Sequence, residues 1–306
     1  MSWFLTGPFL YAAAAILAVG SAVKIVALAR LPRHVRWELY PLPRLGKAGS
    51  KYQKVNFADQ PPHHERLPEI AFMAGEILLF RKAYAGRRDL WFGSLLLHAG
   101  LYLGIALLAL LAAGAILSLM AAEGLSAVVI LDRLAAAIAP LAMAAGLAGA
   151  VYLVALRLVD GGLRAMSDTV TFFNLIFLAT LFGVGLAAWS LSDVAAAQAR
   201  SHLASLLRGR PADVEGGWLA AAMVLFGLFA AYLPFSRMFH FAAKYFFYHQ
   251  VLWDNEAMIA GSRMERGVAA SLEYHPSWSA EHVRRGASWR EQVSAERDEG
   301  DRPHDA

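Results

Sequence analysis

The sequence contains no cysteine among its 306 residues. This absence excludes disulfides, cysteine-ligated iron–sulfur clusters and covalent c-type haem attachment within the chain. The first seven residues carry no Lys or Arg. Because a secretory signal begins with a basic region, we expect the first apolar run to be retained as a helix. The sequence also lacks internal repeats, a Gly-rich phosphate loop, a nucleophile elbow and the HExxH spacing of zinc proteases.

Apolar residues are abundant and make up 58% of the chain, against about 45–50% in an average soluble protein. They gather in five long runs, each reaching the roughly 20 residues that a helix needs to cross a bilayer. The runs are Pro8–Leu31, Leu90–Met120, Leu134–Leu156, Val170–Leu191 and Trp218–Phe239. The sequence therefore predicts an all-α integral membrane protein, a bundle of five transmembrane helices in contact with the lipid bilayer.

Cationic residues are distributed unevenly between the connections. Lys and Arg crowd the long connection from Arg30 to Arg88, and Arg is frequent again after Phe239. The connection Ala121–Asp132 has neither, and Ser192–Gly217 has only three arginines. The positive-inside rule then predicts an N-terminus outside and a cytoplasmic C-terminus, as expected for a multi-pass protein of a bacterial inner membrane. The net charge of +4 follows this bias and does not indicate nucleic acid binding.

Two polar stretches are candidates for partner contacts. The stretch Glu65–Tyr84 has the apolar spacing of one helix, which would lie on the membrane surface or form a docking face. The stretch Trp253–Trp289 contains Trp253, Tyr274, Trp278 and Trp289 but no regular apolar spacing, which is typical of an interaction surface. The charged end, Val283–Ala306, favours disorder or folding onto a partner.

Most of the ten histidines lie in polar connections, where we expect them to be solvated. These are His34, His63, His64, His202, His275, His282 and His304. His249 is nine residues beyond His240, about half a turn out of phase on a helix. His98 remains, roughly 12 Å below the cytoplasmic surface at 1.5 Å per residue, together with His240 at the cytoplasmic end of the fifth run.

An ionisable residue within a membrane helix marks a candidate functional site. Imidazole is a common axial ligand of haem iron, and His98 and His240 both fall in the cytoplasmic half of the bilayer. We therefore hypothesise that these two residues ligate one b-type haem. Gly93 and Gly100 would let a large planar ring approach the backbone near His98. The alternative is that His98 only hydrogen-bonds a neighbouring helix.

Three stretches carry a resemblance to a known family: WFGSLLLHAGLY (Trp91–Tyr102), SDTVTFFNLIFL (Ser167–Leu178) and LPFSRMFHF (Leu233–Phe241). They resemble the gamma subunit of respiratory nitrate reductase and related membrane cytochrome b subunits. These relatives belong to heterodisulfide-reductase-like and sulfate-reducer electron-transfer complexes. RWELYPLP (Arg36–Pro43) and KYFFYHQVLWDNEA (Lys244–Ala257) are more similar to this second branch.

The resemblance implies five transmembrane helices with the N-terminus outside, and His98 and His240 as the axial ligands of a haem b. It also implies electron transfer between menaquinone or ubiquinone and a cytoplasmic iron–sulfur subunit, within a quinone-linked oxidoreductase complex. A haem-free membrane anchor for a soluble redox enzyme is the alternative. A transporter is less favoured, because neither repeats nor broken helices with buried charges stand out in the sequence.

The chain departs from the two-haem members at two positions. Those members have a further histidine ten residues after the first ligand and another eighteen residues before the last. Leu108 and Ala222 stand at these positions here. Eighteen residues make five helical turns, so Ala222 would lie on the face of His240 about 27 Å away. Neither side chain binds iron, and we expect one haem per chain.

The quinone site is less sharply indicated. Lys244, Tyr245, Asn174 and Asp168 are candidates by position, and each is equally explained as an interfacial anchor, a helix cap or an interhelical hydrogen bond. The chain divides into four expected parts. They are a first transmembrane helix (1–31), a cytoplasmic loop with an interfacial helix (32–89), a four-helix haem-binding region (90–242) and a partly disordered cytoplasmic tail (243–306).

Overall fold

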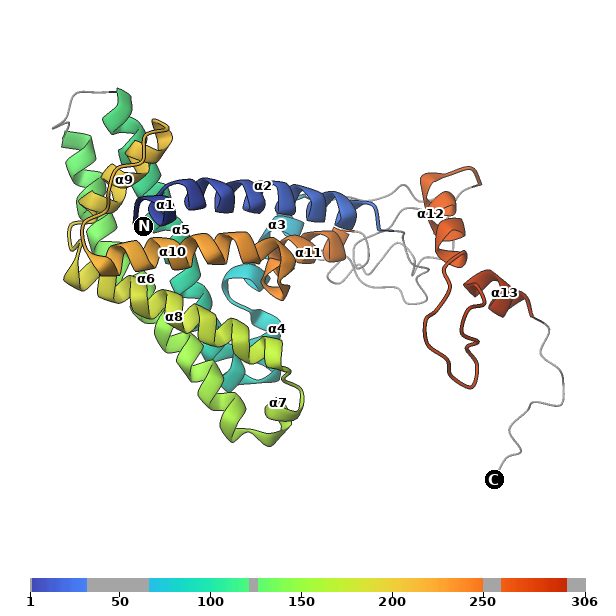
Figure 1. Cartoon of the computed structure of the whole chain (residues 1–306). Helices are drawn as coiled ribbons and strands as arrows, with labels where there is room; N and C mark the ends of the chain where they lie inside the picture. Colours follow the sequence, from blue (N-terminus) through green and yellow to red (C-terminus); the bar gives the residue numbers. More distant parts are fainter. Residues whose placement is uncertain (1, 32–65, 121–125, 250–259, 296–306) are drawn as a thin grey trace. The chain divides into compact units, whose positions relative to one another are not determined.

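The computed structural model describes residues 2–31, 66–120, 126–249 and 260–295. Every long element in these ranges is an α-helix, which confirms the all-α prediction (Figure 1). Within these described ranges, five helices are long and apolar enough to cross a membrane, as the five runs predicted. They are α1 (Ser2–Thr6) with α2 (Pro8–Ala29), α5 (Arg88–Met120), α6 (Ser126–Val159), α8 (Thr169–Leu191), and α10 (Gly217–Tyr232) with the 3₁₀ turn η4 (Leu233–Phe235).

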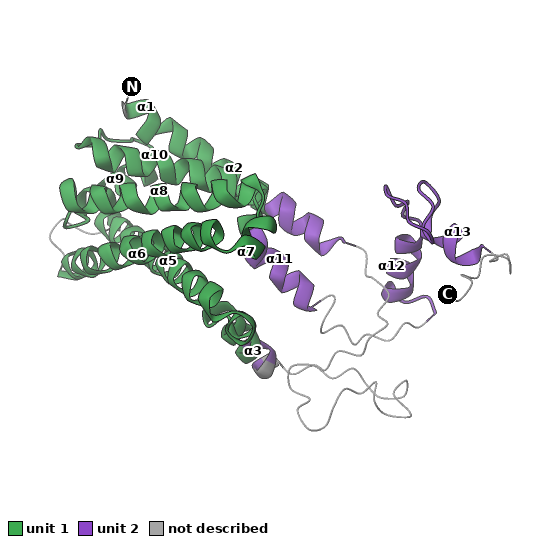
Figure 2. Ribbon diagram, turned by 90° about the horizontal axis from the view of Figure 1, so that it is seen from below, with its two compact units in different colours: residues 1–21, 71–238 green, residues 22–70, 239–306 purple. Residues whose placement is uncertain are grey.

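The described chain forms two units, coloured separately in Figure 2. Unit 1 comprises residues 1–21 and 71–238, and unit 2 comprises residues 22–70 and 239–306. Unit 1 holds most of the membrane-spanning helices. In it α6 packs against both α5 and α8, and α8 packs against α10. A core of Leu97, Ala150, Leu153, Leu175, Leu178 and Phe182 joins α5, α6 and α8.

Glycines set the distance between α5 and α6. A Cβ atom added to Gly100 would lie 2.3 Å from the backbone nitrogen of Gly146, and one added to Gly149 would lie 2.3 Å from that of Leu97. A Cβ at Gly93 would clash with Tyr152 and Leu153 of the same helix α6. The prediction that Gly93 and Gly100 make room for a planar ring is therefore wrong. Both glycines face α6 and allow its backbone to approach, as small residues do in membrane helix pairs.

The fifth predicted run, Trp218–Phe239, is not one helix. Helix α10 ends at Tyr232, and the 3₁₀ turns η4 and η5 (Arg237–Phe239) follow on either side of Ser236. Ser236 has an extended backbone, with φ −96° and ψ 165°, and its hydroxyl accepts a hydrogen bond from the Met238 amide. Proline cannot donate a backbone hydrogen bond, and Pro234 lies at the start of this break.

Two further predicted elements differ from those observed. The stretch Glu65–Tyr84 was predicted as one helix, and the structure has α3 (Arg66–Leu78) and α4 (Arg81–Gly86), separated at Phe80. The connection Ser192–Gly217 contains α9 (Ala197–Leu207), whose first amides bond the carboxylate of Asp193. Arg200 of α9 pairs with Asp132 at 2.7 Å, which ties this connection to the start of α6.

The described residues of unit 2 after the membrane region form three short helices: α11 (His240–Phe247), α12 (Arg263–Leu272) and α13 (Trp289–Ser294). Ser262 caps α12, and Ser288 forms a capping box with Glu291 at the start of α13. Helix α13 lies inside the stretch for which the sequence indicated disorder or folding onto a partner. The last part of that stretch, 296–306, lies outside the described residues.

The close α5–α6 contact predicts a sharp difference between two glycine variants on the same helix. Gly100→Ala should destabilise the protein by about 1–3 kcal/mol, the usual cost of overpacking a tight contact. Gly104→Ala is the control, because a Cβ there meets nothing within 4 Å and alanine favours a helix more than glycine does. Thermal unfolding in detergent measures both. Equal stability of the two variants would contradict the packing role of Gly100.

Candidate functional site

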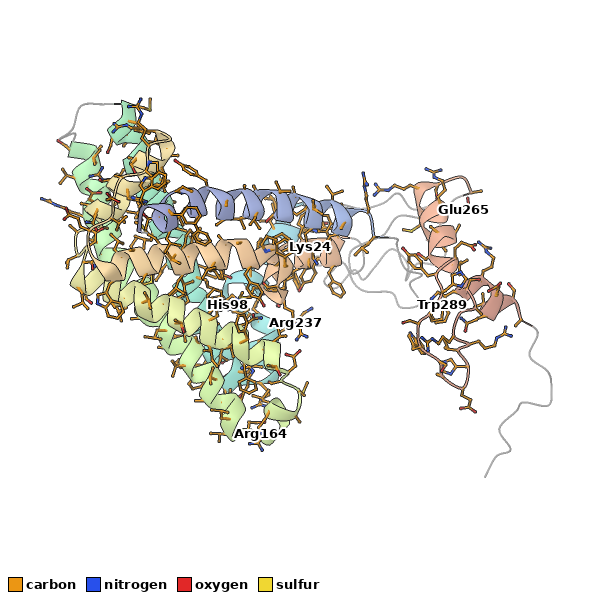
Figure 3. The ribbon with its side chains drawn as sticks, viewed as in Figure 1. Lys24, His98, Arg164, Arg237, Glu265 and Trp289 are labelled. Atoms are coloured by element: carbon orange, nitrogen blue, oxygen red, sulfur yellow. The ribbon has the colours of Figure 1, made fainter. Side chains whose placement is uncertain are left out.

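His98 lies half-buried in α5 within the membrane span, and Figure 3 marks its position. Its Nδ1 is 2.7 Å from the carbonyl oxygen of Ser94, one turn earlier. Because a carbonyl oxygen only accepts, Nδ1 must carry the proton. A neutral imidazole with this tautomer has its lone pair on Nε2. A hydrogen bond from the other ring nitrogen is how metal-ligating histidines are usually oriented.

The turn between α3 and α4 covers the face of α5 that carries His98. Trp91, His98 and Tyr102 share that face, because their spacings of seven and four residues are close to whole turns. Trp91 Nε1 donates to the carbonyl oxygen of Leu79 at 2.8 Å, and the Tyr102 hydroxyl donates to that of Ile77 at 2.7 Å. Hydrogen bonds from two side chains of α5 thus hold the turn against the histidine.

Phe80 brings its ring against the imidazole. The ring centroids of Phe80 and His98 are 4.6 Å apart. Phe80 has φ +48° and ψ +47°, the left-handed region. For a residue other than glycine, this backbone conformation costs on the order of 1–3 kcal/mol. The two hydrogen bonds that fix the turn offset that cost.

His240 lies just beyond the fifth predicted run, as the sequence indicates, but in a separate helix. It is the first residue of α11, separated from α10 by η4, Ser236 and η5, and its side chain is exposed. The count of five uninterrupted helical turns between Ala222 and His240 is therefore wrong. His98 belongs to unit 1 and His240 to unit 2, so their pairing stays a prediction from the sequence.

The candidate quinone residues have different surroundings. Asn174 of α8 is buried, and its side-chain oxygen accepts a hydrogen bond from the Tyr232 hydroxyl of α10 at 2.9 Å. This contact is the interhelical hydrogen bond that the sequence left open. In unit 2, the half-exposed ring of Tyr245 stacks on His249 with centroids 4.2 Å apart. Lys244 places its ammonium nitrogen 6.0 Å from the centre of the Tyr248 ring.

Asp168 caps α8, which is one of the roles that the sequence left open for it. Its carboxylate accepts hydrogen bonds from the hydroxyl and the backbone amide of Thr171 and pairs with Arg237 at 2.6 Å. These donors, the Thr171 hydroxyl foremost, lower the pKa of Asp168 to about 2. Arg237 belongs to the segment just after the break in the fifth helix, so the ion pair connects that segment to the start of α8.

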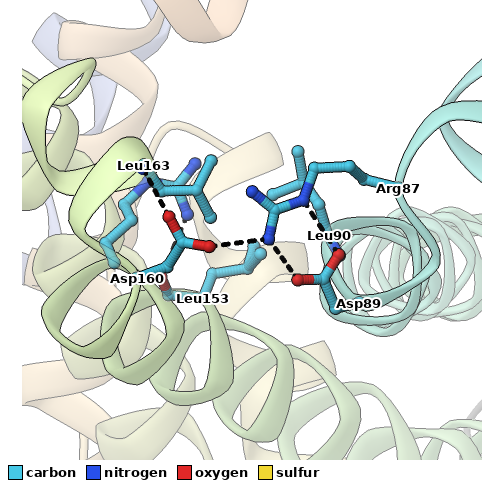
Figure 4. A network of polar contacts seen from close by, with 7 residues as sticks. Arg87, Asp89, Leu90, Leu153, Asp160 and Leu163 are labelled. Atoms are coloured by element: carbon cyan, nitrogen blue, oxygen red, sulfur yellow. Dashed lines mark hydrogen bonds and ion pairs between the residues drawn. The ribbon is translucent and has the colours of Figure 1, made fainter.

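A second polar network joins the start of α5 to the end of α6 (Figure 4). Arg87 contacts the carboxylates of Asp89 and Asp160, the latter at 3.0 Å. The two carboxylates raise the pKa of Arg87 above its usual range. The Leu163 amide, followed by Arg87, lowers the pKa of Asp160. Because Arg87 follows α4 and Asp160 precedes α7 (Gly161–Ala165), this network holds α4 and α7 close to each other at the start of α5 and the end of α6.

His202 was predicted to be solvated, and this prediction is wrong. Its side chain is 4% exposed, and its Nε2 donates to the carbonyl oxygen of Thr6 at 2.7 Å. The helical spacing of Ala199, Leu203 and Leu206 could have identified α9 and the burial of one of its faces. His202 therefore joins α9 to the junction of α1 and α2.

Within residues 2–31, 66–120, 126–249 and 260–295, no three His, Cys, Asp or Glu side chains are grouped closely enough to hold a metal ion. A haem with two axial histidines needs no such group. Comparison of the chain with protein families, curated proteins and solved structures found no match.

The capping contacts of Asp168 predict a pH-dependent contribution to stability. A carboxylate whose pKa falls from its ordinary value near 4 to about 2 on folding stabilises the fold above pH 4 and loses this effect as the pH falls towards 2. The wild type should therefore melt at a higher temperature than Asp168→Asn at pH 6–8, and the gap should narrow below about pH 4.

Asp213→Asn is the matched control, since that exposed carboxylate has no hydrogen-bond or ion-pair partner among the described residues. Melting curves in detergent from pH 3 to pH 8 make the comparison. A gap for Asp168→Asn that is independent of pH would show that the carboxylate charge is not what stabilises the start of α8.

Proposed function

We propose that the chain is the membrane cytochrome b subunit of a quinone-linked oxidoreductase complex. It would carry electrons between a quinone and a cytoplasmic iron–sulfur subunit through one haem b ligated by His98 and His240. The observation that carries the proposal is the hydrogen bond from His98 Nδ1 to the Ser94 carbonyl within a membrane span. It supports Nε2 as a ligating nitrogen, and the LPFSRMFHF stretch around His240 resembles the cytochrome family at its ligand.

The residues present fit a haem by their chemistry. Two neutral imidazoles give a low-spin iron that transfers single electrons and has no open position for oxygen. The Ser94 carbonyl would fix the ring of His98 and raise its basicity, as outer hydrogen-bond partners of metal ligands do. Trp91 and Tyr102 on the same face of α5 hold the covering turn in place and thereby limit access of water to the histidine.

One haem per chain is expected, because the positions of the second pair of ligands are occupied by Leu108 of α5 and Ala222 of α10. Menaquinone or ubiquinone is the proposed diffusible partner, with Lys244, Tyr245 and Asn174 as the proposed contacts. At Asn174 a quinone would compete with the Tyr232 hydroxyl for the amide oxygen. Lys244 and Tyr245 are neighbours on α11, beside the proposed ligand His240.

The proposed orientation follows the cation bias, with the N-terminus outside and residues 32–89 and 243–306 in the cytoplasm of a bacterial cell. The iron–sulfur subunit would dock on these cytoplasmic segments. Within unit 2, the exposed side chains of Tyr274 and Trp278 support this, because exposed aromatics are typical centres of protein interfaces.

A haem-free membrane anchor is the second candidate function. The contact between Phe80 and His98 favours it, because a histidine that packs against an aromatic ring and bonds a carbonyl has a sufficient structural role. The two candidates differ in the visible spectrum of the purified chain. Sharp reduced α and Soret bands support the cytochrome, and a colourless preparation supports the anchor.

The ligand assignment predicts that His98→Ala and His240→Ala each abolish the low-spin haem signal, because loss of one imidazole leaves the iron five-coordinate or the site empty. His249→Ala is the control, since its Nδ1 bonds the Tyr245 carbonyl within its own helix turn and it lies out of phase with His240. Reduced-minus-oxidised spectra at equal amounts of folded protein give the readout. An unchanged spectrum for either ligand variant disproves the assignment.

A further inference from the structure

A surface groove runs between α6 and α8 in unit 1, within the membrane-spanning lengths of both helices. Its volume of about 530 Å³ is in the usual range of about 300–1,000 Å³ for small-molecule sites. The apolar residues that line it are Val151, Val154, Ala155 and Leu158 of α6 and Ile176 and Ala179 of α8. A ligand in this groove would therefore contact mainly hydrocarbon side chains.

Thr180 is the polar residue of the lining, and its hydroxyl donates to the carbonyl oxygen of Ile176 at 2.9 Å. Its hydrogen-bonding capacity as a donor is thus used within α8. A quinone headgroup needs hydrogen bonds to its oxygens, and this lining offers it none beyond that hydroxyl. A hydrocarbon chain has no such requirement, so the chemistry of the lining favours an acyl chain.

Arg164 lies at the end of the groove. Its guanidinium donates to the carbonyl oxygen of Leu158, a lining residue, at 3.3 Å. Figure 3 marks Arg164 in α7, the short helix that joins α6 to α8. Arg164 lies five positions after Val159, the last residue of the α6 span. Its side chain is therefore expected at the level of the lipid headgroups.

The charge of Arg164 is not neutralised by any acidic side chain in the described part of the chain. Among the described residues, Arg87 pairs with Asp89 and Asp160, and Arg237 pairs with Asp168, but Arg164 has no acidic partner. Arg157, in the last turn of α6, has none either, and its Nε is buried without a hydrogen-bond partner in the described part of the chain. An uncompensated positive charge at the headgroup level attracts phosphate.

We propose that this is a binding site for an anionic phospholipid, with an acyl chain in the α6–α8 groove and the phosphate at Arg164. The apolar lining selects a hydrocarbon chain, and the unneutralised cation at the end of that lining selects a negatively charged headgroup over a zwitterionic one. The proposed lipid site requires neither a haem nor a quinone, so a test of lipid binding is independent of the proposed electron-transfer function.

The test is native mass spectrometry of the full chain in detergent, titrated with phosphatidylglycerol or phosphatidylcholine of the same acyl chains. The wild type should retain phosphatidylglycerol in preference to phosphatidylcholine. Arg164→Gln should reduce that preference roughly fivefold, the effect of about one arginine near an anionic headgroup. Thr180→Phe, at an exposed position of the lining, should fill the groove and lower the retention of both lipids.

Arg208→Gln is the matched control. Arg208 is exposed at the end of α9, also without an acidic partner among the described residues, and its replacement removes the same charge elsewhere. It should leave lipid retention unchanged. The proposal is overturned by equal retention of the two lipids, by an equal effect of Arg208→Gln, by displacement of the lipid with inorganic phosphate alone, or by a bound mass that identifies an isoprenoid quinone.

Discussion

The close contact between α5 and α6 is the constraint on which the arrangement around His98 depends. Gly100 and Gly149 allow the two backbones to meet with no side chain between them, and in a membrane such van der Waals contact is a main source of helix association. At 100° per residue, Gly93 and Gly100 lie roughly opposite His98 on α5. The glycines that hold α6 on one face therefore direct His98 towards the other face, where the Ile77–Phe80 turn covers it.

Ion pairs hold the segments next to the helix ends, which the contact between α5 and α6 does not reach. The Arg87 network holds α4 and α7 at the ends of α5 and α6, and the pair of Asp168 and Arg237 holds the segment after α10 at the start of α8. These contacts are exposed, and each such pair contributes little by itself. Their effect is to hold these segments against the helix ends. Among the described residues they leave Arg164 as a cation without an acidic partner at the end of the α6–α8 groove.

The five spans were predictable because length and apolar composition alone decide whether a helix can cross a bilayer. The neighbours of a residue are set by tertiary packing, and for this reason the sequence misassigned Gly93 and Gly100, which contact α6. It likewise missed the burial of His202, whose partner Thr6 is distant in the chain. The break at Ser236 has a local signal in Pro234, but the apolar run continued across it to Phe239 and predicted one helix. For Asp168 the sequence offered a cap as one alternative among several, and the structure identifies it as the cap of α8.

The ratio of haem to protein in the purified full chain distinguishes the cytochrome from the haem-free anchor. The pyridine haemochrome assay, together with the reduced-minus-oxidised spectrum, measures it. We predict one b-type haem per chain with low-spin bands, because the proposed ligands His98 and His240 form one pair and Leu108 and Ala222 cannot form a second. A preparation without haem would contradict the cytochrome function and support the anchor. A ratio near two would show that a second pair of ligands exists.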